Sequence, residues 1–160
     1  MSSAFSTMTD CEFGEANEQL VSLLYVSRIT ITANERESEI NRIVSLARER
    51  NSLRRLTGAL LSTHTHFAQI LEGEAEAVNL LIGALRSDPR HDQLQIVDWE
   101  SIAARRFTGW SMAYSGHSQF VSSHVTRLLD DASPIGRDRA AEWLVELMHE
   151  FVTQNSTAQP

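Results

Sequence analysis

The chain has 160 residues, of which 42% are hydrophobic and 22% charged, a composition typical of one soluble globular domain. Its formal net charge is -7 and all 14 of its basic residues are arginine, a balance that argues against a general nucleic-acid binder. No apolar run approaches the ~18 residues of a membrane-spanning helix, and the single cysteine excludes an internal disulfide or a cysteine-rich zinc site.

The start of the chain predicts a flexible leader, then a strand, then a helix. Residues 1–18 are rich in Ser, Thr and Glu, and they do not resemble a signal peptide. Residues 20–27 (LVSLLYVS) are almost entirely apolar, as in a strand covered on both faces. Asn34 and Glu37 resemble a capping box that begins a helix. This helix should end near Asn51 and should bury a stripe made of Ile40, Ile43, Val44 and Ala47.

The middle of the chain predicts four further strands and one helix. Residues 56–63 and 67–72 should form two strands with a tight connection, and residues 95–99 and 110–115 two more. Between these pairs lies a helix, which ends before Pro89 and carries an apolar stripe of Ala77, Leu80, Leu81 and Ala84. The element order β-α-β-β-α-β-β predicts an α+β fold, a ferredoxin-like sandwich with an added fifth strand.

Two helical patterns follow the last strand and predict a C-terminal helical pair. We therefore divide the chain into a leader, a sandwich domain at 19–116, a helical extension at 117–153 and a flexible tail at 154–160. The segment 133–136 (SPIG) should separate the two helices. The pair should cover the free face of the sheet or dock a partner, through one stripe of Val121, His124, Val125 and Leu128 and another of Ala140, Trp143, Leu144, Leu147, Met148 and Phe151.

Three polar residues lie where these patterns predict core. Tyr25 and Gln69 each occupy the middle of an apolar strand, where a buried hydroxyl or amide needs a partner. Taken alone, both are also explained by a structural hydrogen-bond network, and Asn51 by a helix end. His64 and His66 alternate at a strand end without an apparent third metal ligand nearby, so we expect a solvated hairpin tip. The sequence has no GxSxG, P-loop or GxGxxG motif to indicate an enzyme.

Six short motifs occur in order along the predicted sandwich. They are Leu-Tyr-Val-Ser-Arg at 24–28, Arg-Asn at 50–51, Leu-Thr-Gly-Ala-Leu-Leu at 56–61, Phe-Ala-Gln-Ile-Leu-Glu-Gly at 67–73, Asp-Pro-Arg-His at 88–91 and Arg-Arg-Phe-Thr-Gly-Trp-Ser-Met at 105–112. Each motif is weak alone, but six in one order and at the expected intervals are highly specific. Over roughly residues 20–115 the sequence resembles the BLUF family, blue-light sensors that use FAD.

The resemblance implies that the flavin ring lies between the first two helices, and it assigns roles to nine residues. It makes Tyr25 the photoactive tyrosine and Gln69 the glutamine beside the N5 and O4 atoms of the flavin. It makes Asn51 the amide that binds the pyrimidine edge of the ring, where one side chain must both donate and accept. The fifth strand contributes the pair Trp110 and Met112 near the glutamine. The remaining implied cofactor contacts come from Ile43, Arg90, His91 and Arg50, which replaces the His or Asn common in the family.

We therefore expect a blue-light photoreceptor that binds FAD, without metal and without a catalytic output domain of its own. Light should rearrange the hydrogen bonds of Tyr25 and Gln69, and the fifth strand should pass this change to the C-terminal helices. Those helices should meet a separate effector protein, such as a nucleotide-signalling enzyme or regulator, or another copy of the chain. We expect a cytoplasmic homo-oligomer that binds neither nucleic acid nor membrane. Two alternatives stay open: a light-insensitive flavin-binding interaction module, and a flavin-free ferredoxin-like domain for a small ligand.

Overall fold

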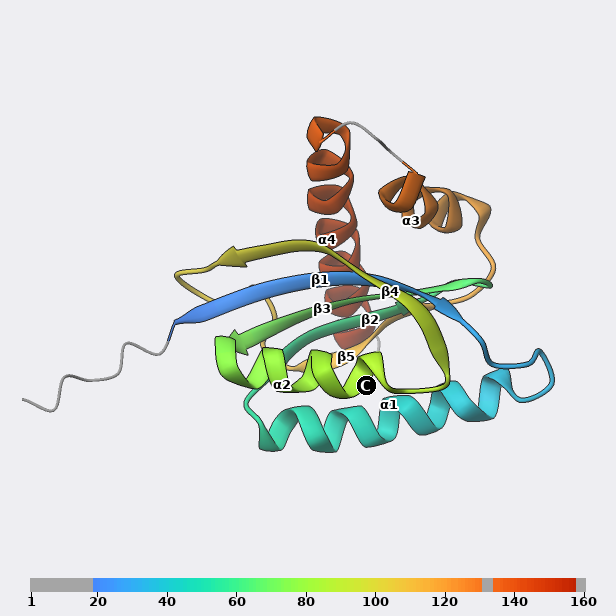
Figure 1. Cartoon of the computed structure of the whole chain (residues 1–160), viewed down its shortest axis with the longest axis horizontal. Helices are drawn as coiled ribbons and strands as arrows, with labels where there is room; N and C mark the ends of the chain where they lie inside the picture. Colours follow the sequence, from blue (N-terminus) through green and yellow to red (C-terminus); the bar gives the residue numbers. More distant parts are fainter. Residues whose placement is uncertain (1–18, 131–133, 158–160) are drawn as a thin grey trace, which may run out of the picture.

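A computed structural model describes residues 19–130 and 134–157 of the protein. The sequence forms, in chain order, β1 (Leu20–Ile29), α1 (Arg36–Leu53), β2 (Thr57–Ser62), β3 (His66–Glu74), α2 (Ala75–Arg86), β4 (His91–Ser101), β5 (Trp110–Ser115), α3 (Gln119–Asp130) and α4 (Pro134–Thr157). Figure 1 shows α1 and α2 on one side of the sheet and α3 and α4 on the other. This architecture confirms the predicted α+β sandwich with its added strand and its C-terminal helical pair.

The five strands form one sheet in the order β4-β1-β3-β2-β5. The first four pair in antiparallel fashion, as in ferredoxin-like folds, and β5 joins β2 in parallel. The register of the inner strands β1 and β3 places Tyr25 directly opposite Gln69. Side chains directly opposite on one face of a sheet are within contact distance. The pairing therefore brings together two polar residues that lie 44 positions apart in the sequence.

Alternation along the strands sends successive side chains into two separate cores. Leu23 and Tyr25 of β1 pack in the core beneath α1 and α2, whereas Leu24 and Val26 pack against α3 and α4. The second core also contains buried residues from α3 and α4, among them Val125 and, at 0% exposure, Leu144. The prediction that the C-terminal pair covers the free sheet face is therefore confirmed.

The N-terminus of α1 differs from the predicted capping box. The N-cap residue is Glu35, and no side chain caps the helix, so the box of Asn34 and Glu37 is wrong. Polar groups bind Glu35 itself instead: Thr32 Oγ1 donates to its carboxylate at 2.8 Å, and Ser38 Oγ donates to its backbone carbonyl at 3.0 Å. The helix begins at Arg36, directly after Glu35.

Helix α1 ends near Asn51, as predicted, but not for the predicted reason. The helix continues beyond Asn51 to Leu53, and Asn51 is completely buried in its last turn. The residue with a left-handed backbone is Arg55, with a φ of 54°, and not Asn51. The Asn51 carbonyl accepts the Leu56 backbone N–H at 2.8 Å, which anchors the chain where it leaves the helix. A left-handed backbone therefore does not explain why this buried position carries an asparagine side chain.

Helix α2 buries only part of the predicted stripe: Leu81 is buried and Ala77 packs against the core, as predicted. Leu80, a member of that stripe, is 64% exposed, whereas Val78, Leu81 and Ile82 are buried. Ala84 of the stripe is also exposed, so the buried face is shifted toward Val78 and Ile82. The burial on α4 is likewise shifted from the predicted stripe, because Ala141 and Val145 are buried beside the correctly predicted Leu144 and Met148.

The last helix is longer than predicted. Helix α4 extends to Thr157, so residues 154–157 are helical where a tail was expected. Asn155 Nδ2 donates to the Ala113 carbonyl of β5 at 3.4 Å, which attaches this last turn to the sheet. The predicted leader at 1–18, part of the predicted break at 133–136, and residues 158–160 lie outside the described residues. Within the described helices, none combines the length and apolar character needed to cross a membrane.

Candidate functional site

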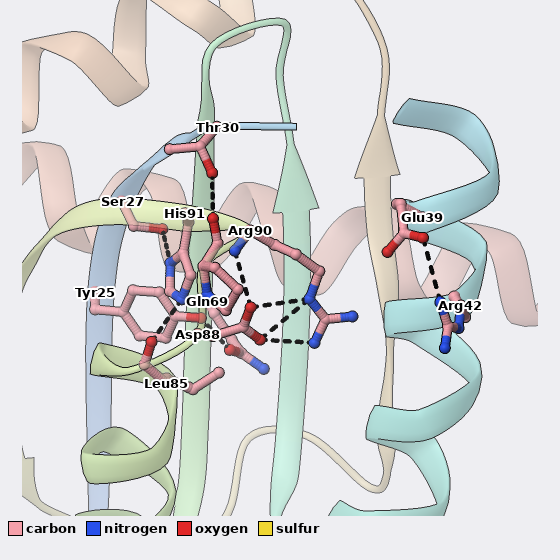
Figure 2. Close-up of polar contacts among 11 residues, drawn as sticks. Tyr25, Ser27, Thr30, Glu39, Arg42, Gln69, Leu85, Asp88, Arg90 and His91 are labelled. Atoms are coloured by element: carbon pink, nitrogen blue, oxygen red, sulfur yellow. Dashed lines mark hydrogen bonds and ion pairs between the residues drawn. The ribbon is translucent and has the colours of Figure 1, made fainter. Parts of the chain in front are cut away.

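A buried tyrosine–glutamine pair lies at the centre of the sheet face that α1 and α2 cover. Tyr25 Oη donates a hydrogen bond to Gln69 Oε1 at 2.5 Å (Figure 2), and the two residues are 2% and 3% exposed. Burial raises the pKa of the Tyr25 hydroxyl above its ordinary value, because a phenolate would lose its solvation there, while the charge of Arg50 opposes this shift. The phenol therefore keeps its proton, which it directs toward the amide oxygen.

A small hollow borders this pair, and we call it the central hollow. Its volume is about 30 Å³. The lining comes from β1, α1, β2, β3, α2, the segment after α2, β4 and β5, namely Tyr25, Ile43, Ala47, Arg50, Leu60, Phe67, Gln69, Leu85, Asp88, His91 and Trp110. The structure thus assembles six of the nine residues singled out from the sequence: Tyr25, Ile43, Arg50, Gln69, His91 and Trp110.

Asn51 follows Ile43 and Ala47 along one row of α1, since residues four apart lie on the same helix face. Its side-chain Nδ2 is buried without a hydrogen-bond partner in the described part of the chain. Its Oδ1 accepts only a long bond of 3.5 Å from Arg50 Nε. The indole Nε1 of Trp110, which lines the central hollow, is also buried without a partner there.

Buried donors without partners are rare in native proteins, because each costs about 1–3 kcal/mol. Two of them on elements that line one hollow indicate a site for a ligand with polar edges. The pyrimidine edge of a flavin presents an N–H between two carbonyls, which an amide such as Asn51 can complement with both its donor and its acceptor. The donor set therefore fits the flavin that the sequence resemblance implies.

His91 is fixed by hydrogen bonds from both ring nitrogens, as Figure 2 shows. Nε2 lies 2.8 Å from the Leu85 carbonyl, which can only accept, so this nitrogen carries a proton. Nδ1 lies 2.7 Å from Ser27 Oγ and, in the neutral ring, accepts the hydroxyl proton. These two hydrogen bonds fix the orientation of the His91 ring, whose centroid lies 6.3 Å from that of the Tyr25 ring. Its nitrogens are already engaged within the chain, so it can offer a ligand only its carbon edge and face.

Arg90 binds Asp88 rather than lining the hollow. Its guanidinium contacts the Asp88 carboxylate in a two-point pair, with Nε–Oδ1 at 2.9 Å and Nη2–Oδ2 at 2.6 Å (Figure 2). The hydrogen bond from Arg90 lowers the pKa of Asp88 below its usual range. Met112 also lies outside the central hollow and lines a separate hollow beside α1. A cofactor contact for Arg90, and a place beside Gln69 for Met112, remain predictions.

The sequence interpretation gave no site role to several residues of the site, among them Ser27, Phe67 and Asp88. Ser27 follows Tyr25 by two positions and Phe67 precedes Gln69 by two, so alternation along each strand would have placed all four on one face. The Phe67 ring meets the His91 ring edge-on at 6.2 Å. Asp88 lay inside a quoted motif, but its pairing with Arg90 depends on a turn that spacing does not reveal.

Comparison with known proteins agrees with this geometry. The family model described as sensors of blue-light using FAD matches residues 20–113. The chain is 38% identical over 88 residues to the blue light- and temperature-regulated antirepressor BluF of Escherichia coli (strain K12), a match that covers 55% of this chain and spans only 21% of that protein.

Solved structures give the same result over a larger share of the chain. The dark-state structure of BlrB, a BLUF protein, is 33% identical with a TM-score of 0.61, and the match covers 78% of this chain and 98% of BlrB. The ground state of BlsA is 26% identical with a TM-score of 0.64, over 81% of this chain and 87% of BlsA. The family match extends over more than half of the sequence. The chain belongs to the BLUF family of blue-light sensors that use FAD.

Proposed function

We propose that Tyr25 and Gln69 convert the absorption of blue light into a new hydrogen-bond pattern, which a separate effector protein detects. The observation that carries this proposal is the buried 2.5 Å hydrogen bond between Tyr25 Oη and Gln69 Oε1 beside the central hollow. When bound, the flavin of FAD supplies the light absorption and, once excited, accepts an electron and a proton. The chain's own residues hold the ring, provide the proton and retain the result.

Asn51, Arg50 and Ile43 of α1 would hold the ring on one side, with Trp110 of β5 close by. Asn51 supplies the unpartnered amide that matches the ring edge. The central hollow, at about 30 Å³, has room for no more than about one or two water molecules. A tricyclic ring is far larger, so groups that line the hollow must move to admit it, and we expect cofactor binding to order this face of the protein.

Tyr25 and Gln69 have complementary roles in this scheme. The raised pKa of Tyr25 means that its hydroxyl loses a proton only together with an electron, because burial disfavours the phenolate. Gln69 Oε1 holds that proton in a hydrogen bond before light absorption. An amide has an acceptor oxygen at one end and a donor nitrogen at the other. Rotation or tautomerisation of Gln69 therefore exchanges its partners, and the new arrangement persists after the proton returns to Tyr25 Oη.

Strand β5 offers a short route from this pair to α4. Trp110 lines the central hollow, while Tyr114 of the same strand stacks on Phe151 of α4 with ring centroids 5.2 Å apart. A displacement of β5 would thus move α4 and the surface that α3 and α4 present to an effector. Hydrogen exchange across residues 137–152 tests this route: protection should differ between dark and light, and identical protection would contradict it. A cytoplasmic location and self-association remain predictions.

The experiment is an absorption spectrum of the FAD-loaded protein before and after blue light. We expect a reversible red shift in the native chain, no shift in Gln69→Leu despite bound FAD, and a normal shift in Gln95→Leu, an exposed glutamine on β4. A native protein that binds FAD without a shift would be a light-insensitive flavin module. A native protein that binds no FAD would be a flavin-free domain. Either result contradicts the proposal.

A further inference from the structure

Two hollows follow α1 on its β5 side, apart from the central hollow. The larger, about 780 Å³, lies between the first half of α1 and the ends of β2 and β5, and it includes Met112. The smaller, about 550 Å³, lies between the end of α1, the start of β2 and the segment that precedes β5. Arg48 lines both. We call the two hollows together the α1–β5 groove.

The charge of this groove is opposite to that of the whole chain. The chain carries a net charge of -7, yet among the described residues that line the groove only Glu37 is acidic. The basic lining residues are Arg36, Arg48, Arg55, Arg105, His64 and His117. Other arginines, among them Arg28 and Arg106, form ion pairs with acids.

The four groove arginines form no ion pair with an acid in the part of the chain that the structure describes. Arg36 donates to the His64 backbone carbonyl, and Arg105 donates to Thr57 Oγ1 at 3.0 Å. Arg48 and Arg55 are exposed. Such a row of uncompensated cations attracts anionic groups and steers their approach.

The shape and lining of the groove favour a polypeptide over a nucleic acid. Helix α1 has 18 residues and is therefore about 27 Å long, which an extended segment of about eight residues would span. Exposed or partly exposed apolar side chains, namely Ala33, Val44 and Met112, lie among the cations. Single-stranded nucleic acids are usually bound by stacking bases on exposed aromatic rings. Trp110, the one Phe, Tyr or Trp among the described residues of this lining, is only 8% exposed.

We infer that the α1–β5 groove docks an extended acidic segment of a partner protein, in which Asp or Glu residues alternate with apolar residues. Strand β5 is an edge of the sheet, where a segment of this kind can also approach the backbone. Trp110 lines both the groove and the central hollow. An occupant of the groove would therefore contact Trp110, which lies beside the Tyr25–Gln69 pair. A role of the groove in light signalling rests on the proposed function.

The test uses FAD-loaded protein kept in the dark, so that it can fail independently of the light response. The probe is a ten-residue peptide in which Glu alternates with Leu, and its binding is followed through backbone amide NMR shifts. We expect shifts in α1 and β5. The double variant Arg48→Gln/Arg55→Gln should bind about 2- to 30-fold more weakly, as expected from the loss of two exposed ion pairs.

The matched control is Arg86→Gln/Arg127→Gln, which removes two exposed charges on α2 and α3 and should leave the affinity unchanged. The proposal is overturned if the peptide does not bind, or if both double variants weaken binding equally. It is also overturned if a ten-nucleotide oligothymidylate binds the same residues more tightly than the peptide. A peptide with Lys in place of Glu should shift no groove amide, and shifts equal to those of the Glu peptide would also contradict the assignment.

Discussion

Buried polar groups on the two faces of the sheet differ in whether they have a partner, although the α1/α2 face also holds the bonded pairs Tyr25–Gln69 and Ser27–His91. On the α1/α2 face, Asn51 Nδ2 and Trp110 Nε1 are buried without partners among the described residues. On the α3/α4 face, the carboxylate of Glu72 is completely buried but well bonded. Its oxygens accept the backbone N–H groups of Arg106 at 2.9 Å and Phe107 at 3.0 Å, and the Arg106 guanidinium at 3.2 Å.

This contrast separates a structural face from a binding face. A buried polar group that the chain satisfies internally stabilises a fold, and Glu72 fastens the segment before β5 to the sheet. Donors that the chain leaves unpaired are costly unless a ligand satisfies them. The α3/α4 face should therefore respond to mutation through stability, and the α1/α2 face through cofactor affinity and light response.

The largest effect on stability should come from Leu144→Ala in the α3/α4 core. Leu144 is 0% exposed, so its truncation leaves a cavity and should lower the free energy of unfolding by about 2–5 kcal/mol. Urea denaturation measures the change, and Leu53→Ala, at an 81% exposed position on α1, is the control with little effect. The red shift of the folded variant should remain. Loss of the red shift at full FAD occupancy would contradict the claim that the α3/α4 face contributes to stability and not to the light response.

Glu72→Gln should have the next largest effect on stability. The amide keeps the volume but replaces one acceptor oxygen by a donor that faces backbone N–H groups, so unfolding should become easier by about 1–3 kcal/mol. Denaturation of the exposed control Glu49→Gln should match that of the native chain. Equal stability of the Glu72 variant would show that the hydrogen bonds of this carboxylate contribute nothing.

Asn51→Leu should give the opposite result to these two variants. Because Nδ2 has no partner within the described chain, its replacement should change the unfolding free energy of the FAD-free protein by less than about 1 kcal/mol. The affinity for FAD should fall about 5- to 150-fold, since the ring edge loses its amide. Titration of the apoprotein with FAD measures this. Unchanged affinity together with lost stability would assign Asn51 to the fold alone.

A smaller effect should appear at alkaline pH. The folded-state pKa of Tyr25 lies above its unfolded value, so the folded chain keeps a proton that the unfolded chain releases. Stability should thus be intact below about pH 10 and decline above it, by up to about 1.4 kcal/mol per pH unit. The chain has no lysine to mask this decline. Denaturation should show a shallower decline for Tyr25→Phe than for Tyr114→Phe, and equal slopes would contradict the assignment.

The sequence predicted the architecture well because alternation and helical spacing report burial directly. The order of elements, the strand at 110–115 and the covering of both sheet faces all followed from apolar patterns. Helix ends and faces were less predictable. Leu80 is as apolar as Leu81, and only the position of the sheet decides which of them is buried.

The site was predictable to the extent that it consists of polar residues within apolar strands. Tyr25 and Gln69 stood out for that reason, and the motifs added Asn51 and His91. Ion pairs formed after folding, such as Arg90 with Asp88, left no pattern in the sequence. Glu72 lay inside a quoted motif, yet its partners lie more than 30 positions away and only the structure joins them.

The measurement that tests the central claim most directly is the light-minus-dark absorption difference of two FAD-loaded variants, Tyr25→Phe and Tyr114→Phe. Both remove one phenolic hydroxyl, from β1 beside the central hollow and from β5 on the side of α4. The account predicts bound FAD in both, a normal reversible red shift in Tyr114→Phe and none in Tyr25→Phe. A normal shift in Tyr25→Phe would contradict the claim that the Tyr25–Gln69 pair converts light into a signal.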